Sequence, residues 1–317
     1  MQENTATTSQ VRYLEIDHEH SGQRLDNYLF TLLKGVPKSH VYRILRSGEV
    51  RINRGRCRPN YRIQGGDLLR IPPLRLGERA QNTLPLSGLL LSLEACVIYE
   101  DNNILILNKP SGVAVHAGSG VNAGVIEALR ELRPQERFIE LVHRLDRETS
   151  GCLVLAKSRQ ALIAMQSQWR TPKTVRKNYT ALVKGHWSGG RRHVSIALRR
   201  NVLRSGERLV NPSESGRQAE SIFTPRDTYL NSSLVEIELL TGRTHQARVH
   251  AAEIGHPIAG DSKYGNRHFN QHCRQLGLNR LFLHASKLQF FHPIDRRSFE
   301  IEASLPDTLQ NLLHSQL

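Results

Sequence analysis

The stretch Glu140-Leu-Val-His-Arg-Leu-Asp-Arg-Glu-Thr-Ser-Gly-Cys-Leu-Val-Leu-Ala-Lys157 places a charge-dense segment between two apolar runs. Short apolar runs bounded by polar and turn-forming residues are typical of β-strands. Within the segment, Asp146 is flanked by His143, Arg144 and Arg147, and nearby positive charge favours the ionised form of a carboxyl group. The stretch therefore predicts a loop between two strands that carries a carboxylate able to act as a nucleophile or base. The alternative is an ordinary solvated ion pair.

The composition of the chain is strongly basic. Its 317 residues include 44 Lys and Arg against 29 Asp and Glu, which gives a formal net charge of +15. Such a charge favours a polyanionic partner such as a nucleic acid. The length is sufficient for two domains, and a hydrophobic content of 38% is compatible with a globular fold.

Membrane and secretory signals are not evident in the sequence. There is no apolar run of about eighteen residues that could span a bilayer, and residues 1–10 have neither a charged n-region nor an apolar h-region. The four cysteines, Cys57, Cys96, Cys152 and Cys273, are scattered without C-x-x-C spacing and are expected to be free thiols in a reducing compartment. We therefore expect a cytoplasmic protein.

Composition along the chain divides it into four segments. Residues 1–11 are expected to form a disordered tail, and residues 12–75 a first compact module that closes with Pro72-Pro73. Residues 76–93 are a mixed connector, and residues 94–317 form the second domain.

Two short helices and a hairpin are expected in the first module. Apolar residues recur at helical spacing over 25–32, and a second helix is expected with Ser39 as its N-cap and Gly48 as its stop. Basic residues gather on the polar face of this helix and in the hairpin over 50–58. The candidate nucleic-acid contacts are Lys38, Arg43, Arg46, Arg54 and Arg56. A cluster of one sign with almost no interleaved acid argues against the alternative, a merely solubilising face.

The second domain is predicted to belong to the α+β class. Residues 97–107 predict a hairpin of two β-rich runs joined by Asp-Asn-Asn. Further strands are expected at 153–156, 179–183, 194–198, 221–224, 233–240, 281–283 and 299–302. Helices are expected at 125–132, 160–169, 244–254 and 305–314, the third with Thr244 as N-cap and Arg248 on the flank of its buried face. Strands dominate and helices lie between them at irregular intervals, which favours α+β over a regular alternation.

Several motifs follow one another in a defined order. They are Asn108-Lys-Pro-Ser-Gly-Val-Ala-Val-His116, His143-Arg-Leu-Asp-x-x-Thr-Ser-Gly151, Lys177-Asn-Tyr179, Thr241-Gly-Arg-Thr-His-Gln-Ala-Arg-Val-His250, Gly255-His-Pro-Ile258 and Leu283-His-Ala285. Together they resemble the RluA-type pseudouridine synthases, which isomerise uridine to pseudouridine in folded RNA. The resemblance runs from about residue 12 to 305, and the basic module resembles an S4-type RNA-binding domain. Within the family, residues 33–53 are most similar to enzymes that act on large-subunit (23S) ribosomal RNA.

The resemblance implies a mixed, largely antiparallel sheet with a cleft, and three catalytic residues. Asp146 is implied to act at the ribose, either by adding to C1′ or by helping to remove the C2′ proton, and the sequence does not choose between them. Tyr179 is implied to stack on the flipped uracil with its hydroxyl near C5, although most strand tyrosines are half-buried core residues. Arg248 is implied to pair with Asp146, although surface exposure is the commoner fate of Arg. Arg144 is implied to fill the gap left by the extruded base, with a salt bridge inside the loop as its alternative.

No metal and no cofactor are expected. His245, His250 and His256 are spaced by five and six residues, so they do not share one helical face, and no Cys or carboxylate completes a ligand set. Residues 109–112 are similar to phosphate-cradling loops, but the G-x-x-x-x-G-K-[ST] pattern is not present. We therefore expect a monomeric enzyme that acts on RNA through protein residues alone. The alternative is a catalytically silent RNA-binding factor, which would not need the complete set of Asp146, Tyr179 and Arg248.

Overall fold

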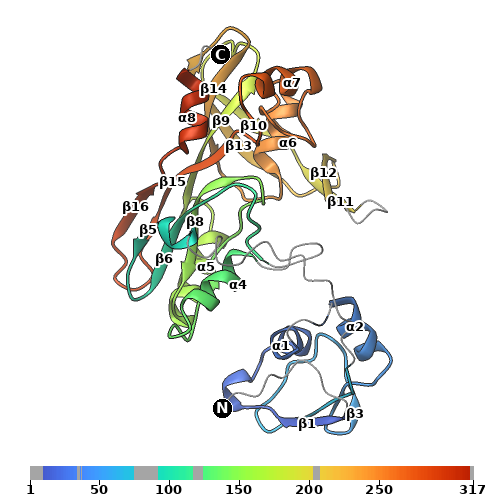
Figure 1. The fold of residues 1–317 in the computed structure, drawn as a ribbon. Helices are drawn as coiled ribbons and strands as arrows, with labels where there is room; N and C mark the ends of the chain where they lie inside the picture. The colour runs from blue at the N-terminus through green and yellow to red at the C-terminus, as the bar shows by residue number, and fades with distance from the viewer. Residues whose placement is uncertain are drawn as a thin grey trace. The chain divides into compact units, whose positions relative to one another are not determined.

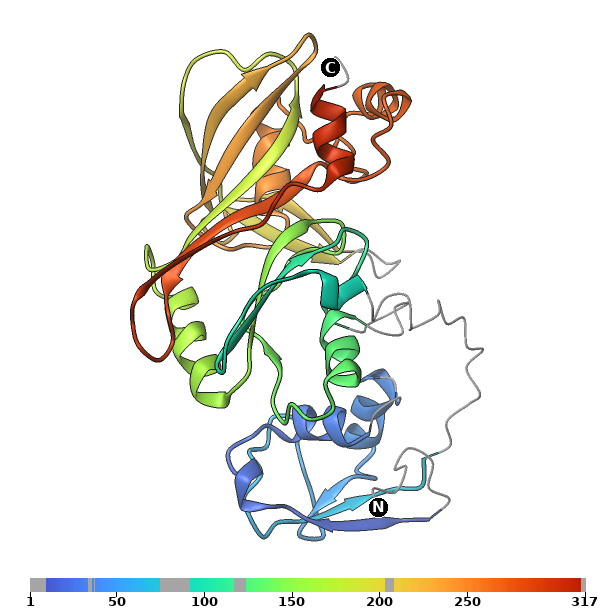
Figure 2. The same ribbon diagram turned by 60° about the vertical axis from the view of Figure 1, so that its left-hand side comes forward.

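The computed structural model describes residues 10–33, 36, 38–74, 92–116, 124–202 and 208–314. Two compact units, residues 1–82 and 83–317, make up the chain (Figures 1 and 2). Each unit has a hydrophobic core of its own.

The smaller unit packs two helices on a four-stranded antiparallel sheet. The sheet has the order β1-β4-β2-β3, with β1 at Arg12–Glu15, β4 at Leu68–Ile71, β2 at Arg51–Ile52 and β3 at Gly55–Arg56. A 3-10 turn, η1, spans His18–His20, and the helices are α1 (Leu25–Leu32) and α2 (Lys38–Arg46). The apolar faces of both helices are buried against the sheet through Leu25, Leu29, Val41 and Ile44. This confirms the helical spacing read from the sequence.

The end of α2 follows the prediction, but its start does not. Gly48 has a φ of +74°, a conformation that favours glycine and stops the helix. The predicted N-cap at Ser39 is wrong, because the helix already begins at Lys38. The sequence has Pro37 directly before this start, and proline is favoured where a helix begins. After the helix, Asn53 and Arg54 both have positive φ, 49° and 67°, as a two-residue type I′ hairpin turn requires.

The larger unit is built on a ten-stranded mixed sheet. Its order is β10-β13-β14-β9-β15-β8-β6-β5, with β16 paired to β15 and β7 paired to β8. The strands are β5 (Val97–Glu100), β6 (Ile104–Lys109), β7 (Glu140–Leu141), β8 (Ser150–Ala156), β9 (Arg176–Lys184), β10 (Arg192–Ser195), β13 (Glu220–Thr228), β14 (Ser232–Leu239), β15 (Leu283–Phe291) and β16 (Ser298–Glu302). Among these pairs only β15 with β8 is parallel. A separate antiparallel ribbon joins β11 (Leu198–Val202) to β12 (Arg208–Pro212). The predicted α+β class with a largely antiparallel sheet is confirmed.

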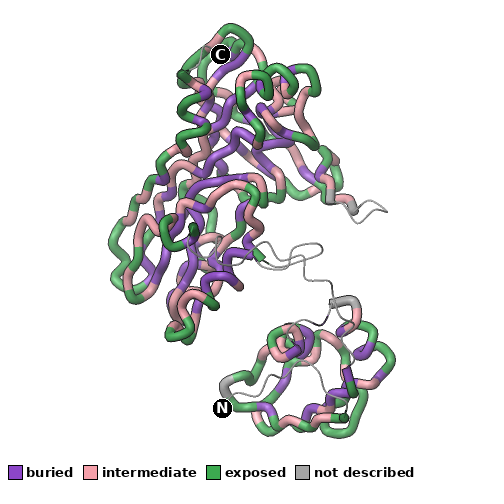
Figure 3. Tube along the Cα trace, in the orientation of Figure 1, coloured by how far each residue is buried: buried purple, intermediate pink, exposed green. Residues whose placement is uncertain are grey.

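Helices cover both faces of this sheet. They are α4 (Val125–Leu132), α5 (Arg159–Arg170), α6 (Gln246–Glu253), α7 (Arg267–Gln275) and α8 (Asp307–His314). Side chains alternate along β6, so that Leu105 and Leu107 pack with α4 while Ile104 and Ile106 pack with α5. In Figure 3, buried residues follow the middle strands of the sheet.

Several elements differ from the sequence prediction, which contained no strands at the positions of β1, β4 and β12. The strand predicted at 194–198 is divided between β10 and β11. The strand predicted at 281–283 begins at Leu283 and runs to Phe291, and α7 was not predicted. Within the described residues, no helix is long and apolar enough to cross a membrane.

Candidate active site

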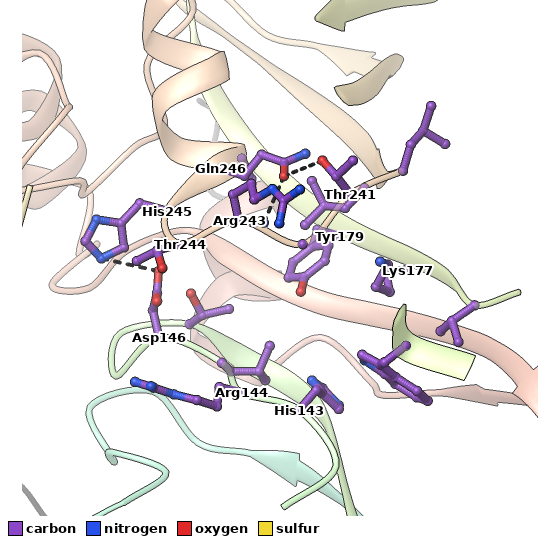
Figure 4. A pocket seen from close by; sticks show the side chains of 18 of the residues that line it. His143, Arg144, Asp146, Lys177, Tyr179, Thr241, Arg243, Thr244, His245 and Gln246 are labelled. Atoms are coloured by element: carbon purple, nitrogen blue, oxygen red, sulfur yellow. Dashed lines mark hydrogen bonds and ion pairs between the residues drawn. The ribbon is translucent and has the colours of Figure 1, made fainter. Parts of the chain in front are cut away.

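A pocket of about 700 Å³ brings the sequence-predicted residues of the larger domain together (Figure 4). It lies between the loop 142–149, strand β9, the loop after β14 and the start of α6. Asp146, Arg144, Tyr179 and Arg248 all line it. The volume lies within the range of small-molecule sites, which is sufficient for one nucleotide.

The carboxylate of Asp146 faces two side chains, Arg248 of α6 and His245, which is the N-cap residue of that helix. Its Oδ2 atom lies 3.7 Å from His245 Nε2 and 3.8 Å from Arg248 Nη1, and its side chain is 31% exposed. Arg147, in contrast, donates from Nε to the Gly112 carbonyl at 2.9 Å. The positive charge near Asp146 therefore comes from α6 as well as from its neighbours in sequence.

His143 is not a source of that charge. Its Nε2 accepts a hydrogen bond from the Val154 amide at 3.1 Å, so this nitrogen carries no proton. Burial, together with the charge of Lys177, lowers the pKa of His143 to about 4. Its ring stacks on Trp169, with the ring centroids 5.1 Å apart. His143 is thus a neutral residue that fixes the start of the loop, and the sequence-based expectation of a positive charge here is wrong.

The segment 109–113 holds the loop 142–149 in place. Lys109 is fully buried, and its Nζ donates to the carbonyls of Pro110 at 2.7 Å, Val113 at 2.9 Å and Arg147 at 3.2 Å. Burial, followed by the charge of Arg280, lowers the pKa of Lys109 to about 7. The three carbonyls nonetheless match the three donors of an ammonium group, so we assign the protonated form. The motif that is similar to a phosphate loop thus supports the loop that carries Asp146.

Arg248 is buried and is oriented by a residue that the sequence analysis did not single out. It is 2% exposed, and its Nε and Nη2 atoms each donate at 2.7 Å to the carboxylate of Asp261. Burial opposes ionisation of Asp261, but the hydrogen bonds and charge of Arg248 hold the pKa of this carboxyl below its usual value. The predicted contact with Asp146 exists at 3.8 Å, and Glu148 lies at the same distance, so both are longer than the contact with Asp261. The bidentate pair fixes the plane of the guanidinium.

The start of α6 differs from the prediction at Thr244. The N-cap is His245, whose backbone is left-handed with φ 54° and ψ 17°. No side chain among the described residues caps this helix. Gln246, its first residue, instead accepts at Oε1 from the Arg243 amide at 3.0 Å and from Thr241 Oγ1 at 2.7 Å. Its Nε2 donates to the Glu220 carbonyl at 2.8 Å. One buried side chain thus fastens the turn before α6 to the sheet.

Tyr179 and Lys177 project from the same face of β9 into the pocket. Tyr179 packs where two clusters of the core meet. Burial, then the negative charge of Asp146, raises the pKa of the Tyr179 phenol, so it is protonated in the free protein. Burial lowers the pKa of Lys177. Arg144 is exposed at the pocket, and within the described residues no carboxylate lies within ion-pair distance of it.

The basic residues of the smaller unit form an exposed surface. Arg43, Arg46, Arg54 and Arg56 are all exposed. The side chain of Arg56 lies over Gly48, where an added Cβ would come within 2.7 Å of its Nε. Arg56 therefore reaches from the hairpin to the end of α2, which makes the basic surface continuous. The side chain of Lys38 lies outside what the structure describes.

No group of three His, Cys, Asp or Glu side chains in the described ranges is arranged to hold a metal ion. His250 is buried, and His245 lines the pocket.

Comparisons with known proteins agree with this arrangement. The family model for RNA pseudouridylate synthase matches residues 103–253, and the S4 domain model matches residues 23–69. The chain is 51% identical to ribosomal large subunit pseudouridine synthase C of Haemophilus influenzae, over 96% of this chain and 95% of that protein. The chain belongs to the pseudouridine synthase family. It is also 48% identical to the protein of the same name from Escherichia coli K12, over 96% and 97% of the two chains.

Solved structures of pseudouridine synthases share the fold. Human RNA pseudouridylate synthase domain containing 4 aligns with a TM-score of 0.61 and 27% identity, over 73% of this chain and 96% of that one. The resemblance read from the motifs is confirmed, and the similarity to the synthases named for the large ribosomal subunit extends over 96% of the chain. The protein is therefore a pseudouridine synthase with an N-terminal S4 domain.

Proposed function

We propose that this enzyme isomerises uridine to pseudouridine at defined positions of large-subunit (23S) ribosomal RNA, with Asp146 as the catalytic group. The observation that carries the proposal is the position of the Asp146 carboxylate in the pocket, 3.7 Å from His245 and 3.8 Å from Arg248. The substrate is supported by the name of the relatives that share about half of their residues with this chain.

The geometry supports a role for Asp146 at the ribose of the bound uridine. The N1–C1′ bond breaks with its electron pair on uracil, and the base rotates and rejoins C1′ through C5. An ionised carboxylate beside C1′ and C2′ serves either as the nucleophile at C1′ or as the base for the C2′ proton. Both routes need an ionised carboxylate. Arg248, held by Asp261, supplies the opposite charge that keeps a carboxylate in an RNA-binding pocket.

Tyr179 is assigned to hold the detached uracil. Its ring reaches the pocket from a rigid central strand, as a stacking platform requires. Because burial raises its pKa, the phenol removes the C5 proton only after passing on its own proton. Stacking has no such condition, so the hydroxyl and the ring can be tested separately.

RNA contacts are assigned to two regions. Arg144, exposed at the pocket and without a carboxylate partner among the described residues, is suited to enter the stack from which the base is flipped. We divide the chain into an RNA-binding module at residues 12–75, a connector at 76–93 and a catalytic domain at 94–317. The first module carries the basic surface of Arg43, Arg46, Arg54 and Arg56. Lys38 is assigned to this surface from its place in the sequence.

Location and assembly follow from the substrate and the site. A ribosomal RNA substrate supports a cytoplasmic location. We propose that the protein acts as a monomer, because Asp146, Tyr179 and Arg248 line one pocket without a residue from a second copy. We assign no cofactor, because each step above uses side chains of the protein.

Mapping of pseudouridine in ribosomal RNA tests the proposal. RNA from cells that lack the protein should lose pseudouridine at a small set of large-subunit positions, and the wild-type protein should restore them. Identical maps with and without the protein would contradict the proposed function, and a changed map in another RNA would correct its substrate.

A further inference from the structure

His245 is held in a strained conformation beside the candidate catalytic carboxylate. Its left-handed backbone, with φ 54° and ψ 17°, is uncommon for a residue other than glycine. It makes no capping hydrogen bond with its side chain that would explain this conformation. Strain of this kind persists where the surroundings impose it, and it concentrates at functional sites. Its consequence here is that the imidazole points at Asp146 (Figure 4).

The hydrogen bonds of the Tyr264 hydroxyl favour one of the two neutral tautomers of His245. The Val210 amide donates to the Tyr264 hydroxyl oxygen at 2.9 Å, and the same hydroxyl lies 2.8 Å from His245 Nδ1. A hydroxyl oxygen can accept two hydrogen bonds, but if it also accepted one from Nδ1, the O–H of Tyr264 would have no partner among the described residues. Donation of this O–H to Nδ1 is therefore the favoured arrangement. Nδ1 is then an acceptor. A neutral His245 therefore carries its proton on Nε2, the atom that faces Asp146.

The charges around His245 favour this neutral form. Burial lowers the pKa of His245, and the positive charges of Arg248 and Lys263 lower it further, whereas Asp146 and Asp261 oppose them. The imidazole is therefore a neutral N–H donor aimed at Asp146 Oδ2. Arg248 Nη1 approaches the same oxygen from 3.8 Å.

We propose that His245 is a positioning residue for Asp146, and that Tyr264 fixes the imidazole tautomer in which it donates. This rests on the proposed function of Asp146. The separation of 3.7 Å between Nε2 and Oδ2 is too long for a hydrogen bond. Catalytic hydrogen bonds often shorten when substrate binds, and this one closes when RNA fills the pocket. The carboxylate is then oriented by two donors, His245 and Arg248, toward the ribose.

Tyr264→Phe is the most specific test, because it removes the hydroxyl and keeps the ring over which the Arg248 guanidinium lies, 5.3 Å from its centroid. We expect kcat at saturating RNA to fall by about 10- to 100-fold, the scale of a misoriented catalytic group, with KM changed little. Tyr99→Phe is the matched control in the same domain. It also loses a hydrogen bond to a neighbouring side chain, to Asp101 at 3.0 Å, but Tyr99 does not line the pocket.

A pH profile separates this role from a structural one. The Tyr264 hydroxyl donates to the neutral imidazole and so disfavours its protonation. Its loss should raise the pKa of His245 and move the acid limb of kcat to higher pH, whereas Tyr99→Phe should leave the limb in place. At position 245, His245→Gln keeps an N–H donor and should retain more kcat than His245→Leu, which has comparable backbone strain.

Nuclear magnetic resonance of the ¹⁵N-labelled histidine ring reports the tautomer without any turnover. The wild-type protein should show the Nε2–H form of His245, and Tyr264→Phe should show a mixture. Product formation by the wild type tests the proposed function separately. The inference is overturned if the ring is protonated on Nδ1, or if an active wild type and Tyr264→Phe share the same kcat and acid limb.

Discussion

Arg248 is bound more closely by Asp261 than by Asp146: two hydrogen bonds of 2.7 Å join it to Asp261, while its remaining terminal nitrogen lies 3.8 Å from Asp146. The buried carboxylate of Asp261 therefore serves as the fixed counterion, and the contact with Asp146 can change during the reaction. Asp261 also accepts from the amides of Lys263 and Tyr264 at 2.9 and 3.0 Å, which fixes its own orientation.

Asp261→Asn should damage both stability and activity. The substitution leaves the Arg248 charge buried with a neutral partner, and breaking a buried ion pair in this way costs about 3–5 kcal/mol of unfolding free energy. Urea unfolding and kcat measured on the same preparation test this. Glu140→Gln is the control, since the Glu140 side chain pairs with Arg130 where both side chains are more than 40% exposed, and exposed pairs contribute little. Equal stability of the two variants would show that the buried pair is unimportant.

Stability should fall as the pH is lowered from about 6.5 toward 4. Burial lowers the pKa of His143 and of His284 to about 4 in the folded protein. In the unfolded chain both titrate near the ordinary value of about 6.5, so the unfolded state binds more protons between these limits. Each histidine then contributes up to roughly 3 kcal/mol that is present above pH 6.5 and is lost on acidification. Urea unfolding at several pH values measures the slope. A flat profile would mean that these rings titrate in the folded protein as they do in the unfolded chain.

Tyr179→Phe should separate stacking from proton transfer. The ring remains and only the hydroxyl is removed, so RNA binding should be unchanged. If the hydroxyl takes part in proton removal at C5, the base is detached but the product is not released, and an adduct should accumulate with a fluorinated uridine substrate. Normal conversion by the Phe variant would limit Tyr179 to stacking.

Neutralising the basic surface of the smaller unit should weaken RNA binding more than turnover. Replacement of Arg43, Arg46, Arg54 and Arg56 by Gln should flatten the log–log salt dependence of binding, by about 0.7 to 0.9 for each phosphate that the protein no longer neutralises. Because arginine–phosphate pairs position RNA without reading bases, kcat at saturating RNA should change little. The control carries the same change in charge at exposed arginines of the larger unit, namely Arg137, Arg159, Arg267 and Arg296. If the salt dependence of binding were unchanged in the variant of the smaller unit, its basic surface would be exposed to solvent without contacting RNA.

Regular elements were predictable where one pattern determines them. Helix α4 was predicted at its observed bounds, because its apolar residues recur at helical spacing. Helix α7 was missed because few of its residues are apolar, and only Phe269 and Cys273 are buried. Most of β15 was missed because it carries polar residues such as His284, which is buried but bonded to Ser150 at 2.9 Å. A hydrophobic pattern cannot show that a polar side chain is buried with a hydrogen-bond partner.

The residues that line the candidate site were predictable from the motifs. The residues that orient them through tertiary contacts were not. Asp146, Tyr179 and Arg248 were identified, and they line one pocket. Asp261 lies thirteen residues after Arg248, and nothing in that spacing indicates an ion pair. Lys109 is 38 residues before Arg147, so its brace on the loop appears only in the fold.

Product formation by Asp146→Asn tests the central claim most directly. The substitution keeps the size of the side chain and removes its charge. Glu148→Gln is the matched control, a carboxylate of the same loop that also lies 3.8 Å from Arg248. With purified proteins and a large-subunit RNA transcript, Asp146→Asn should bind RNA like the wild type but form pseudouridine more than ~10³-fold more slowly, while Glu148→Gln keeps most of its activity. If Asp146→Asn retained a tenth of the wild-type rate, Asp146 would not be the catalytic group.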